Sequence, residues 1–338
     1  MFHIVLFLLF FSFNILKLEG VIYIKKKSEQ SQIRLEYLYD PSFYSIRGIL
    51  VLLHGCSHSA TDFFKKEDVE DNACSNCLNL PAEKNIIKIA KDKNLLPLAI
   101  SSMNSKNKCW NHYDLDFINE AVNDVIKRTK MDIKNVYVFG ASSGASMAFH
   151  LSTHSHLLKF KLSGIICQIA IPQEQQFALL KEHKSKIPTV IMTMSRDHAQ
   201  VRLIPSISKH YKDNGIPFHH FLVEPKQMTV EYFVKYGINK VLSEDIVTAL
   251  LTNRIISKSG SQEEKMLLRH DPRSSDWRRY IQPVLSSSSG SSGSSTDSLK
   301  ADASPISEIM NIAYAFHEMT DEYVADAIEF LDTHQSSI

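Results

Sequence analysis

The sequence of 338 residues predicts an α/β fold in which a mainly parallel central sheet carries helices on both faces and a helical cap is inserted. Three observations support this prediction. Short apolar segments alternate with helical patterns, which is typical of parallel βαβ units. A Gly-x-Ser-x-Gly motif stands directly between one of these segments and a helix. The hydrophobic content of 44% is enough for the core of one large domain, which we place at residues 21–338.

Seven segments have the apolar runs of strands that are buried in a sheet. They are residues 33–39, 47–54, 95–102, 135–140, 164–170, 187–194 and 217–224. Four helices are expected on the main domain. One begins at Pro81 and runs through IIKIAKDK, the second covers residues 115–129, the third follows the Gly-x-Ser-x-Gly motif, and the last covers residues 320–334.

The alternation of strands and helices stops near residue 226. Helical stretches at 229–236 and 242–254 are followed by a polar segment at 269–280. We therefore expect an inserted cap at about residues 226–300. Within it, the run SSSSGSSGSS (286–295) cannot bury apolar surface and is expected to be a flexible loop.

Residues 1–20 are interpreted as a targeting segment, because positions 4–16 are almost wholly apolar and three lysines follow at 25–27. A cleaved signal peptide and an uncleaved membrane anchor both fit this pattern. The apolar stretch is short for a membrane span, so the secretory pathway is favoured and anchoring through this segment is the alternative.

The charged residues nearly balance, with 38 lysines and arginines against 37 aspartates and glutamates. The formal charge of +1 produces no overall field that would hold a polyanion. Nucleic acid is therefore not expected as a partner, and the oligomeric state is left open.

Five cysteines do not decide the redox environment. In an oxidising compartment, Cys56, Cys74, Cys77 and Cys109 could form two disulfides in any of three pairings, and reduced thiols are equally consistent with the sequence. A zinc site needs four ligands at suitable spacing, and only the Cys74–Cys77 pair has that spacing. No metal and no cofactor are predicted.

The motif Gly140-Ala141-Ser142-Ser143-Gly144 is the most informative stretch of the sequence. Between a strand and a helix, such a motif raises the serine hydroxyl above the sheet on a sharp turn, with glycines where side chains would collide. We therefore predict that Ser142 is a nucleophile.

A serine nucleophile needs a base and an acid that orients the base. Asp197 follows the apolar strand at 187–194, where an open α/β sheet gathers its functional groups, although an N-cap role fits it too. His317 stands just before the last helix and completes the chain order Ser, Asp, His. His270 is the second choice for the base.

The loop after the strand at 47–54 reads His54-Gly55-Cys56-Ser57-His58 and is expected to supply an oxyanion donor. We assign the backbone N–H groups of Cys56 and Ser143 to an oxyanion hole. His54 and His58 alone are too few ligands for a metal. His54, Trp110 and Trp277 are candidate walls of the substrate pocket, and simple packing is the alternative for both tryptophans.

The motifs HGCSHSATDF (54–63), CSNCLNLP (74–81), KCW (108–110), GASSGA (140–145) and AFHEMT (315–320) extend the pattern over residues 47–331. Together they resemble the α/β-hydrolase superfamily. The resemblance is strongest to an uncharacterised group of plant and algal hydrolase-like proteins and more distant to polyhydroxybutyrate depolymerases and feruloyl esterases. It implies the α/β-hydrolase fold and the triad positions Ser142, Asp197 and His317, but no substrate.

These observations predict a serine hydrolase that acts on a small-molecule ester through an acyl-enzyme. A serine peptidase or an acyltransferase could use the same residues. A catalytically inactive hydrolase fold that binds a ligand is the alternative from outside the enzymes, since a fold alone does not establish a reaction.

Overall fold

The computed structural model describes residues 20–28, 34–42, 45–257, 265–288, 299–301 and 303–335. The expected targeting segment lies outside these residues except for Gly20, as does most of the serine-rich run. Among the described residues, no helix combines the length and apolar character that crossing a membrane requires.

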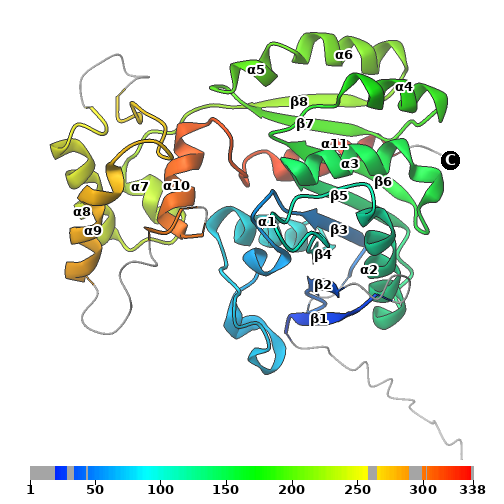
Figure 1. The fold of residues 1–338 in the computed structure, drawn as a ribbon, viewed down its shortest axis with the longest axis horizontal. Helices are drawn as coiled ribbons and strands as arrows, with labels where there is room; N and C mark the ends of the chain where they lie inside the picture. The colour runs from blue at the N-terminus through cyan, green and yellow to red at the C-terminus, as the bar shows by residue number, and fades with distance from the viewer. Residues whose placement is uncertain are drawn as a thin grey trace, which may run out of the picture.

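One sheet of eight strands forms the centre of the described part of the chain, in the order β1-β2-β4-β3-β5-β6-β7-β8 (Figure 1). β1 pairs antiparallel with β2 and β2 antiparallel with β4, while all other neighbours are parallel. The strands are β1 (Ile22–Lys27), β2 (Arg34–Tyr39), β3 (Gly48–Leu53), β4 (Leu95–Ile100), β5 (Asn135–Ala141), β6 (Leu162–Gln168), β7 (Thr189–Met194) and β8 (Phe218–Val223). This strand order with helices on both faces is the α/β-hydrolase fold, which confirms the predicted fold class.

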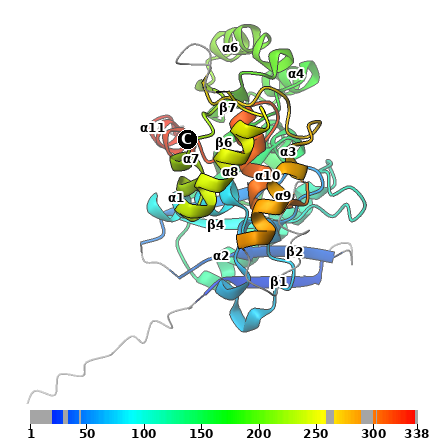
Figure 2. The ribbon, with the colours of Figure 1, turned by 90° about the vertical axis from the view of Figure 1, so that its left-hand side faces the viewer.

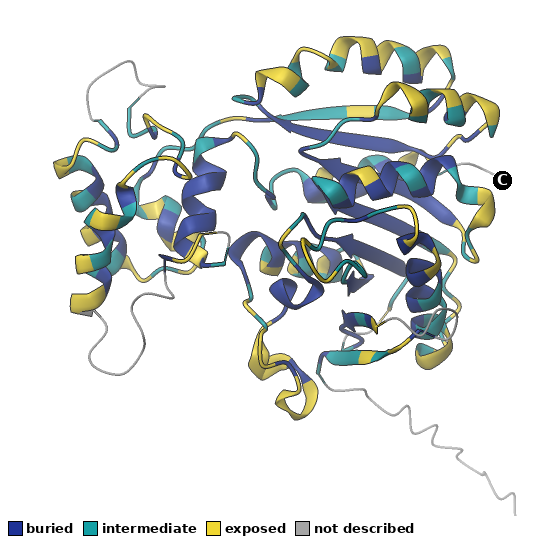
Figure 3. Cartoon of the chain, viewed as in Figure 1, coloured by how far each residue is buried: buried dark blue, intermediate teal, exposed yellow. Residues whose placement is uncertain are grey.

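Two apolar cores lie on the two faces of the sheet. Successive side chains of a strand point to opposite faces, so Val51 and Leu53 of β3 join one core while Leu50 and Leu52 join the other. The first core is covered by α2 (Asp114–Thr129), α3 (Ser143–Thr153), α4 (Glu174–Glu182) and α6 (Ile204–Asp213), and the second by α1 (Pro81–Asp92) and α11 (Val324–Thr333). Figure 3 shows the inner strands of the sheet as buried, whereas the edge strands β1 and β8 are largely half-buried or exposed.

The cap stands at one end of the sheet and has a third core of its own (Figures 1 and 2). Its helices are α7 (Val230–Lys235), α8 (Lys240–Thr252), α9 (Trp277–Ser288) and α10 (Pro305–Tyr314). α10 also packs against α1, so it joins the cap to the main domain.

Helix α9 begins in the polar segment at 269–280 and extends into the run at 286–295 that was predicted to be a loop. Trp277, Ile281 and Leu285 recur every four residues and bury one stripe of the helix in the cap core. The prediction of a loop from residue 286 is wrong for its first three residues, because they continue this helix.

Candidate active site

Ser142 lies at the sharp turn between β5 and α3, with φ 53° and ψ −113°. The turn depends on two glycines. A Cβ on Gly140 would lie 2.2 Å from the carbonyl oxygen of Gly144, and a Cβ on Gly144 would lie 2.2 Å from that of Leu53. Real side chains cannot approach backbone so closely, so both positions require glycine.

The His317 imidazole faces Ser142, with 3.3 Å between His317 Nε2 and Ser142 Oγ. His317 lies on the connection between α10 and α11, which is fixed to the sheet by Gln168. The Gln168 side chain donates to the carbonyl of Thr320 at 2.7 Å and accepts from the Thr320 N–H at 3.0 Å. Contacts with β6 thus hold the segment of His317 beside Ser142, although 175 residues separate His317 from Ser142 in sequence.

Asp197 follows β7, and its carboxylate Oδ2 lies 3.8 Å from His317 Nδ1. This distance fits an ion pair and exceeds that of a hydrogen bond. The carboxylate also caps α5 (His198–Val201), accepting from the Gln200 backbone N–H at 3.2 Å and from its side chain at 2.8 Å. Asp197 therefore has the N-cap contact that the sequence allowed and also faces the imidazole.

A cavity of about 190 Å³ opens beside Ser142 and His317. Gly55 and Cys56 form one wall of it, and Ser143 begins α3 directly after the serine. Within the described residues, the N–H groups of Cys56 and Ser143 donate to no other protein group. Of these two residues, Cys56 lines the cavity itself and Ser143 is the direct neighbour of the lining residue Ser142.

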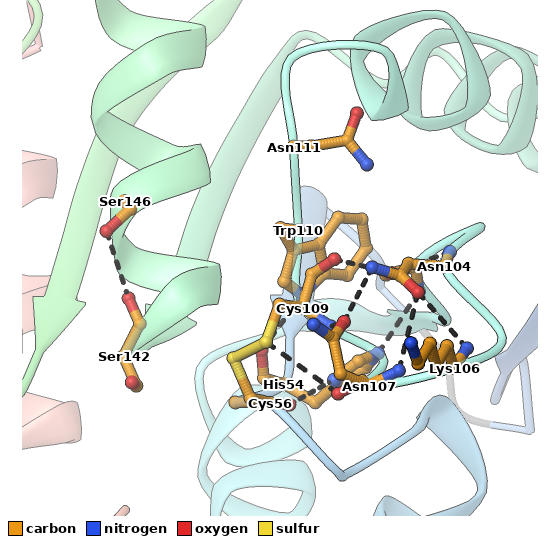
Figure 4. The surroundings of a disulfide bond; sticks show 12 residues. His54, Cys56, Asn104, Lys106, Asn107, Cys109, Trp110, Asn111, Ser142 and Ser146 are labelled. Carbon is orange, nitrogen blue, oxygen red and sulfur yellow. Dashed lines mark hydrogen bonds between the residues drawn. A yellow bond between two sulfur atoms is a disulfide. The ribbon is translucent and has the colours of Figure 1, made fainter.

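A disulfide joins Cys56 to Cys109 and so ties the loop after β3 to the loop after β4 (Figure 4). The Ser57 N–H donates to the carbonyl of Asn107 at 2.8 Å and supports the same junction. A second disulfide links Cys74 to Cys77, and Cys167 is buried and unpaired. The structure thus selects one of the three pairings that the sequence left open.

The three proposed pocket walls lie elsewhere. His54 is fully buried beneath the loop, where Nδ1 donates to the carbonyl of Gly55 at 2.6 Å and Nε2 accepts from the Ser102 N–H at 3.1 Å. Burial is the largest influence and lowers the pKa of His54 to about 4, so it is neutral. Trp110 packs against this ring and donates to the His54 carbonyl at 2.9 Å. Both residues support the loop from behind and do not line the cavity.

The prediction that Trp277 forms a wall of the substrate pocket is also wrong. It is completely buried in the cap core, and its indole N–H donates to the carbonyl of Pro272 at 3.0 Å. The large apolar ring packs within the cap core, so it does not line the cavity beside Ser142.

Three charged side chains that the sequence did not mark as pocket residues line the cavity: His58, Arg273 and Glu318. Arg273 comes from the cap and reaches it only through the tertiary fold. His58 carries a local signal, because Asp62 follows one helical turn later and accepts from its Nδ1 at 3.0 Å. Histidine with a carboxylate at this spacing could have been recognised as an oriented pair.

A buried pair of carboxyl groups, Glu83 and Glu308, lies between α1 and α10, where each affects the ionisation of the other. Burial is the largest influence on both and raises their pKa values, that of Glu83 to about 7 and that of Glu308 well above its usual range. Glu308 also accepts from the Ala82 N–H at 3.3 Å. The pair docks the cap's last helix onto the main domain.

The described residues contain no group of three histidine, cysteine or acidic side chains that could hold a metal ion.

No family model matches the chain, and no curated protein matches it. Solved structures with a similar chain path include the Pyrococcus furiosus esterase Pf2001, with 12% identity, a TM-score of 0.43 and coverage of 60% of this chain and 80% of that one. The Bacillus cereus carboxylesterase shows 14% identity and a TM-score of 0.38, with 56% and 84% covered. A fungal esterase from Rhizomucor miehei shows 13% identity and a TM-score of 0.41, with 69% and 84% covered. None of these similarities assigns a reaction to this chain, and the resemblance to plant and algal proteins stays a prediction.

Proposed function

We propose that this protein is a serine hydrolase that cleaves carboxylic esters through an acyl-enzyme. Ser142 acts as the nucleophile, His317 as the base and Asp197 as the acid that orients the base. The contact of 3.3 Å between Ser142 Oγ and His317 Nε2, at a strained turn after a parallel strand, carries the proposal.

In the proposed reaction, His317 Nε2 takes the hydroxyl proton as Ser142 Oγ attacks the ester carbonyl carbon. The oxyanion that forms accepts hydrogen bonds from the N–H groups of Cys56 and Ser143. His317 then gives the proton to the departing alcohol, which leaves an acyl group on Ser142. Water, activated by the same imidazole, releases the acid and restores the serine.

Asp197 supports the imidazolium that exists during both steps. Its present distance of 3.8 Å from Nδ1 requires only a small shift to become a hydrogen bond, and such contacts often tighten when substrate is bound.

Covalent labelling with a fluorophosphonate probe tests the proposal. We expect the full chain to be labelled and the Ser142→Ala variant to be unlabelled, while Ser146→Ala, one turn further along α3, is labelled like the wild type. Folded wild-type protein that takes no label would reject the nucleophile and favour a binding protein. Turnover measurements then distinguish the reactions. Cleavage of peptides would identify a peptidase, and transfer of the acyl group to an added alcohol would identify an acyltransferase.

We also propose that the protein passes through the secretory pathway. The two disulfides support this, since such bonds persist mainly in oxidising compartments. Retention in a membrane through an uncleaved N-terminal segment is the alternative.

A further inference from the structure

The cavity beside Ser142 is small. Its volume of about 190 Å³ lies below the range of about 300–1,000 Å³ that drug-sized ligands occupy. It therefore suits one part of a substrate, and its position between the serine and the proposed oxyanion donors makes that part the acyl group. The side chains that line it then decide which acyl groups are accepted.

His58 presents a hydrogen-bond donor to this cavity. Nδ1 is held by Asp62, while Nε2 has no partner among the described residues, and the side chain remains 16% exposed. Burial opposes a charge on the ring, but the bond to Asp62 and the negative charges of Glu83, Asp62 and Glu318 outweigh it and raise the pKa of His58 to about 9. The imidazole is accordingly a cation at neutral pH.

Arg273 presents further donors from the cap side. Its Nη2 donates to the carbonyl of His317 and, at 2.9 Å, to Glu318 Oε2. Nη1 lies 3.9 Å from Asp271, beyond hydrogen-bond distance, and Nε has no partner in the described part of the chain. A guanidinium has five N–H groups, so most of its donors remain available.

Glu318, which also lines the cavity, is paired with Arg273 and accepts from two further donors. Oε2 accepts from Arg273 and from the Asn311 side chain at 2.9 Å, and Oε1 accepts from the Met319 N–H at 3.0 Å. The cavity wall therefore carries two cationic side chains that keep unpaired donors within the described residues, Nε2 of His58 and Nη1 and Nε of Arg273. Such an arrangement is complementary to an anion.

We propose that His58 and Arg273 form a binding position for a carboxylate in the acyl pocket, so that the preferred substrates are half-esters of dicarboxylic acids. The inference rests on the proposed ester hydrolysis at Ser142. It names the acyl class: the distal carboxylate lies between the two cations while the ester carbonyl lies at Ser142.

Two ethyl esters of equal chain length test the inference: ethyl hydrogen adipate, which carries a distal carboxylate, and ethyl hexanoate, which does not. For the wild-type full chain we expect kcat/KM to be at least about tenfold higher for the adipate, which is within reach of one charged hydrogen bond. His58→Gln can keep the contact with Asp62 but loses the charge. It and Arg273→Gln should each bring the ratio of the two kcat/KM values, adipate over hexanoate, down towards one, because each removes one of the two cations that would hold the distal carboxylate. Arg269→Gln, an exposed arginine of the same segment, is the matched control and should leave the preference intact.

Three outcomes overturn the inference. A wild type that prefers ethyl hexanoate, or treats both esters alike, has no carboxylate position. Variants that lower both rates by one factor identify Arg273 and His58 as supports of the His317 loop. A wild type that hydrolyses neither ester and takes no fluorophosphonate label contradicts the proposed function itself, which separates that failure from the first two. Thermal melting of each variant establishes that it is folded.

Discussion

Ser142 combines an unfavourable backbone conformation with a position in the wall of the cavity. A non-glycine residue at φ 53° and ψ −113° costs about 1–3 kcal/mol, and such strain persists only when the surroundings enforce it. Here its N–H donates to the carbonyl of Gln168 at 2.9 Å, and α3 packs against the end of β3 at Gly144. The strained serine is thus held by the two strands that flank β5.

Removing the base or its partner should slow turnover without unfolding the protein. We expect His317→Ala and Asp197→Asn each to lower kcat/KM for an ester by at least about a hundredfold, the low end of general acid–base contributions. The measurement is the initial rate of hydrolysis, with thermal melting to establish that the variants are folded.

His270, the alternative base, is exposed and does not line the cavity, so His270→Ala serves as the control. Near-normal turnover in His317→Ala would reject that residue as the base. The same result in Asp197→Asn would leave Asp197 with its capping role alone.

At the scale of elements, the contact between α1 and α10 depends on protons. Glu83 and Glu308 have raised pKa values in the folded protein, so they contribute stability that is complete below the pKa of an unfolded glutamate, about 4.3. That contribution is lost as pH rises through the folded pKa values, near 7 for Glu83 and well above the usual range for Glu308.

Glu308→Gln should reduce this pH dependence. A glutamine amide can donate to Glu83 and accept from the Ala82 N–H as the protonated acid does, but it cannot ionise. We expect equal melting temperatures at pH 5 and a variant that is more stable by about 2 °C or more at pH 8. Parallel melting curves across this pH range would contradict the shared proton.

The two disulfides should contribute unequally. In the chain-entropy description, a bond that closes 53 residues contributes about 4 kcal/mol and one that closes 3 residues about 2 kcal/mol. We expect Cys109→Ser to lower the free energy of unfolding by roughly twice as much as Cys77→Ser, as measured by urea denaturation. Cys109→Ser should also lower kcat, because it frees the loop that carries the Cys56 N–H. Equal kcat in the two variants would show that the loop needs no tether.

The sequence predicted elements wherever burial leaves a local pattern. Strands such as β3 and β5 are continuous apolar runs, and the strained turn has its own motif, so all seven expected strands and Ser142 were found. β1 was not expected, because only the first half of this edge strand is apolar and its second half is three exposed or half-buried lysines. His58 and Arg273 meet only through tertiary packing, which no local pattern encodes.

At the scale of the whole molecule, Val21 joins the start of the described chain to the domain. It is buried, its N–H donates to the carbonyl of Asp68 at 2.8 Å, and its own carbonyl accepts from Glu70 at 3.0 Å. Val21, which directly follows the predicted targeting segment, is therefore part of the folded domain.

This boundary predicts where processing occurs. If the segment is a cleaved signal peptide, the mature protein should begin near Val21 and retain β1 intact. Amino-terminal sequencing of the protein from a secreting host measures this. Recovery of the intact start in a membrane fraction would instead establish the anchor.

The connection that carries His317 runs from one apolar core to another: Ala313 belongs to the cap core, whereas Ala315 and Met319 belong to the core that α1 and α11 cover on one face of the sheet. His317 therefore lies on a segment that both cores hold in place, whereas Ser142 lies at the end of β5 in the sheet. A smaller core has less buried surface to lose on heating. We therefore expect the cap to unfold first on heating, so that the proposed ester hydrolysis is lost at a lower temperature than the one at which the sheet unfolds.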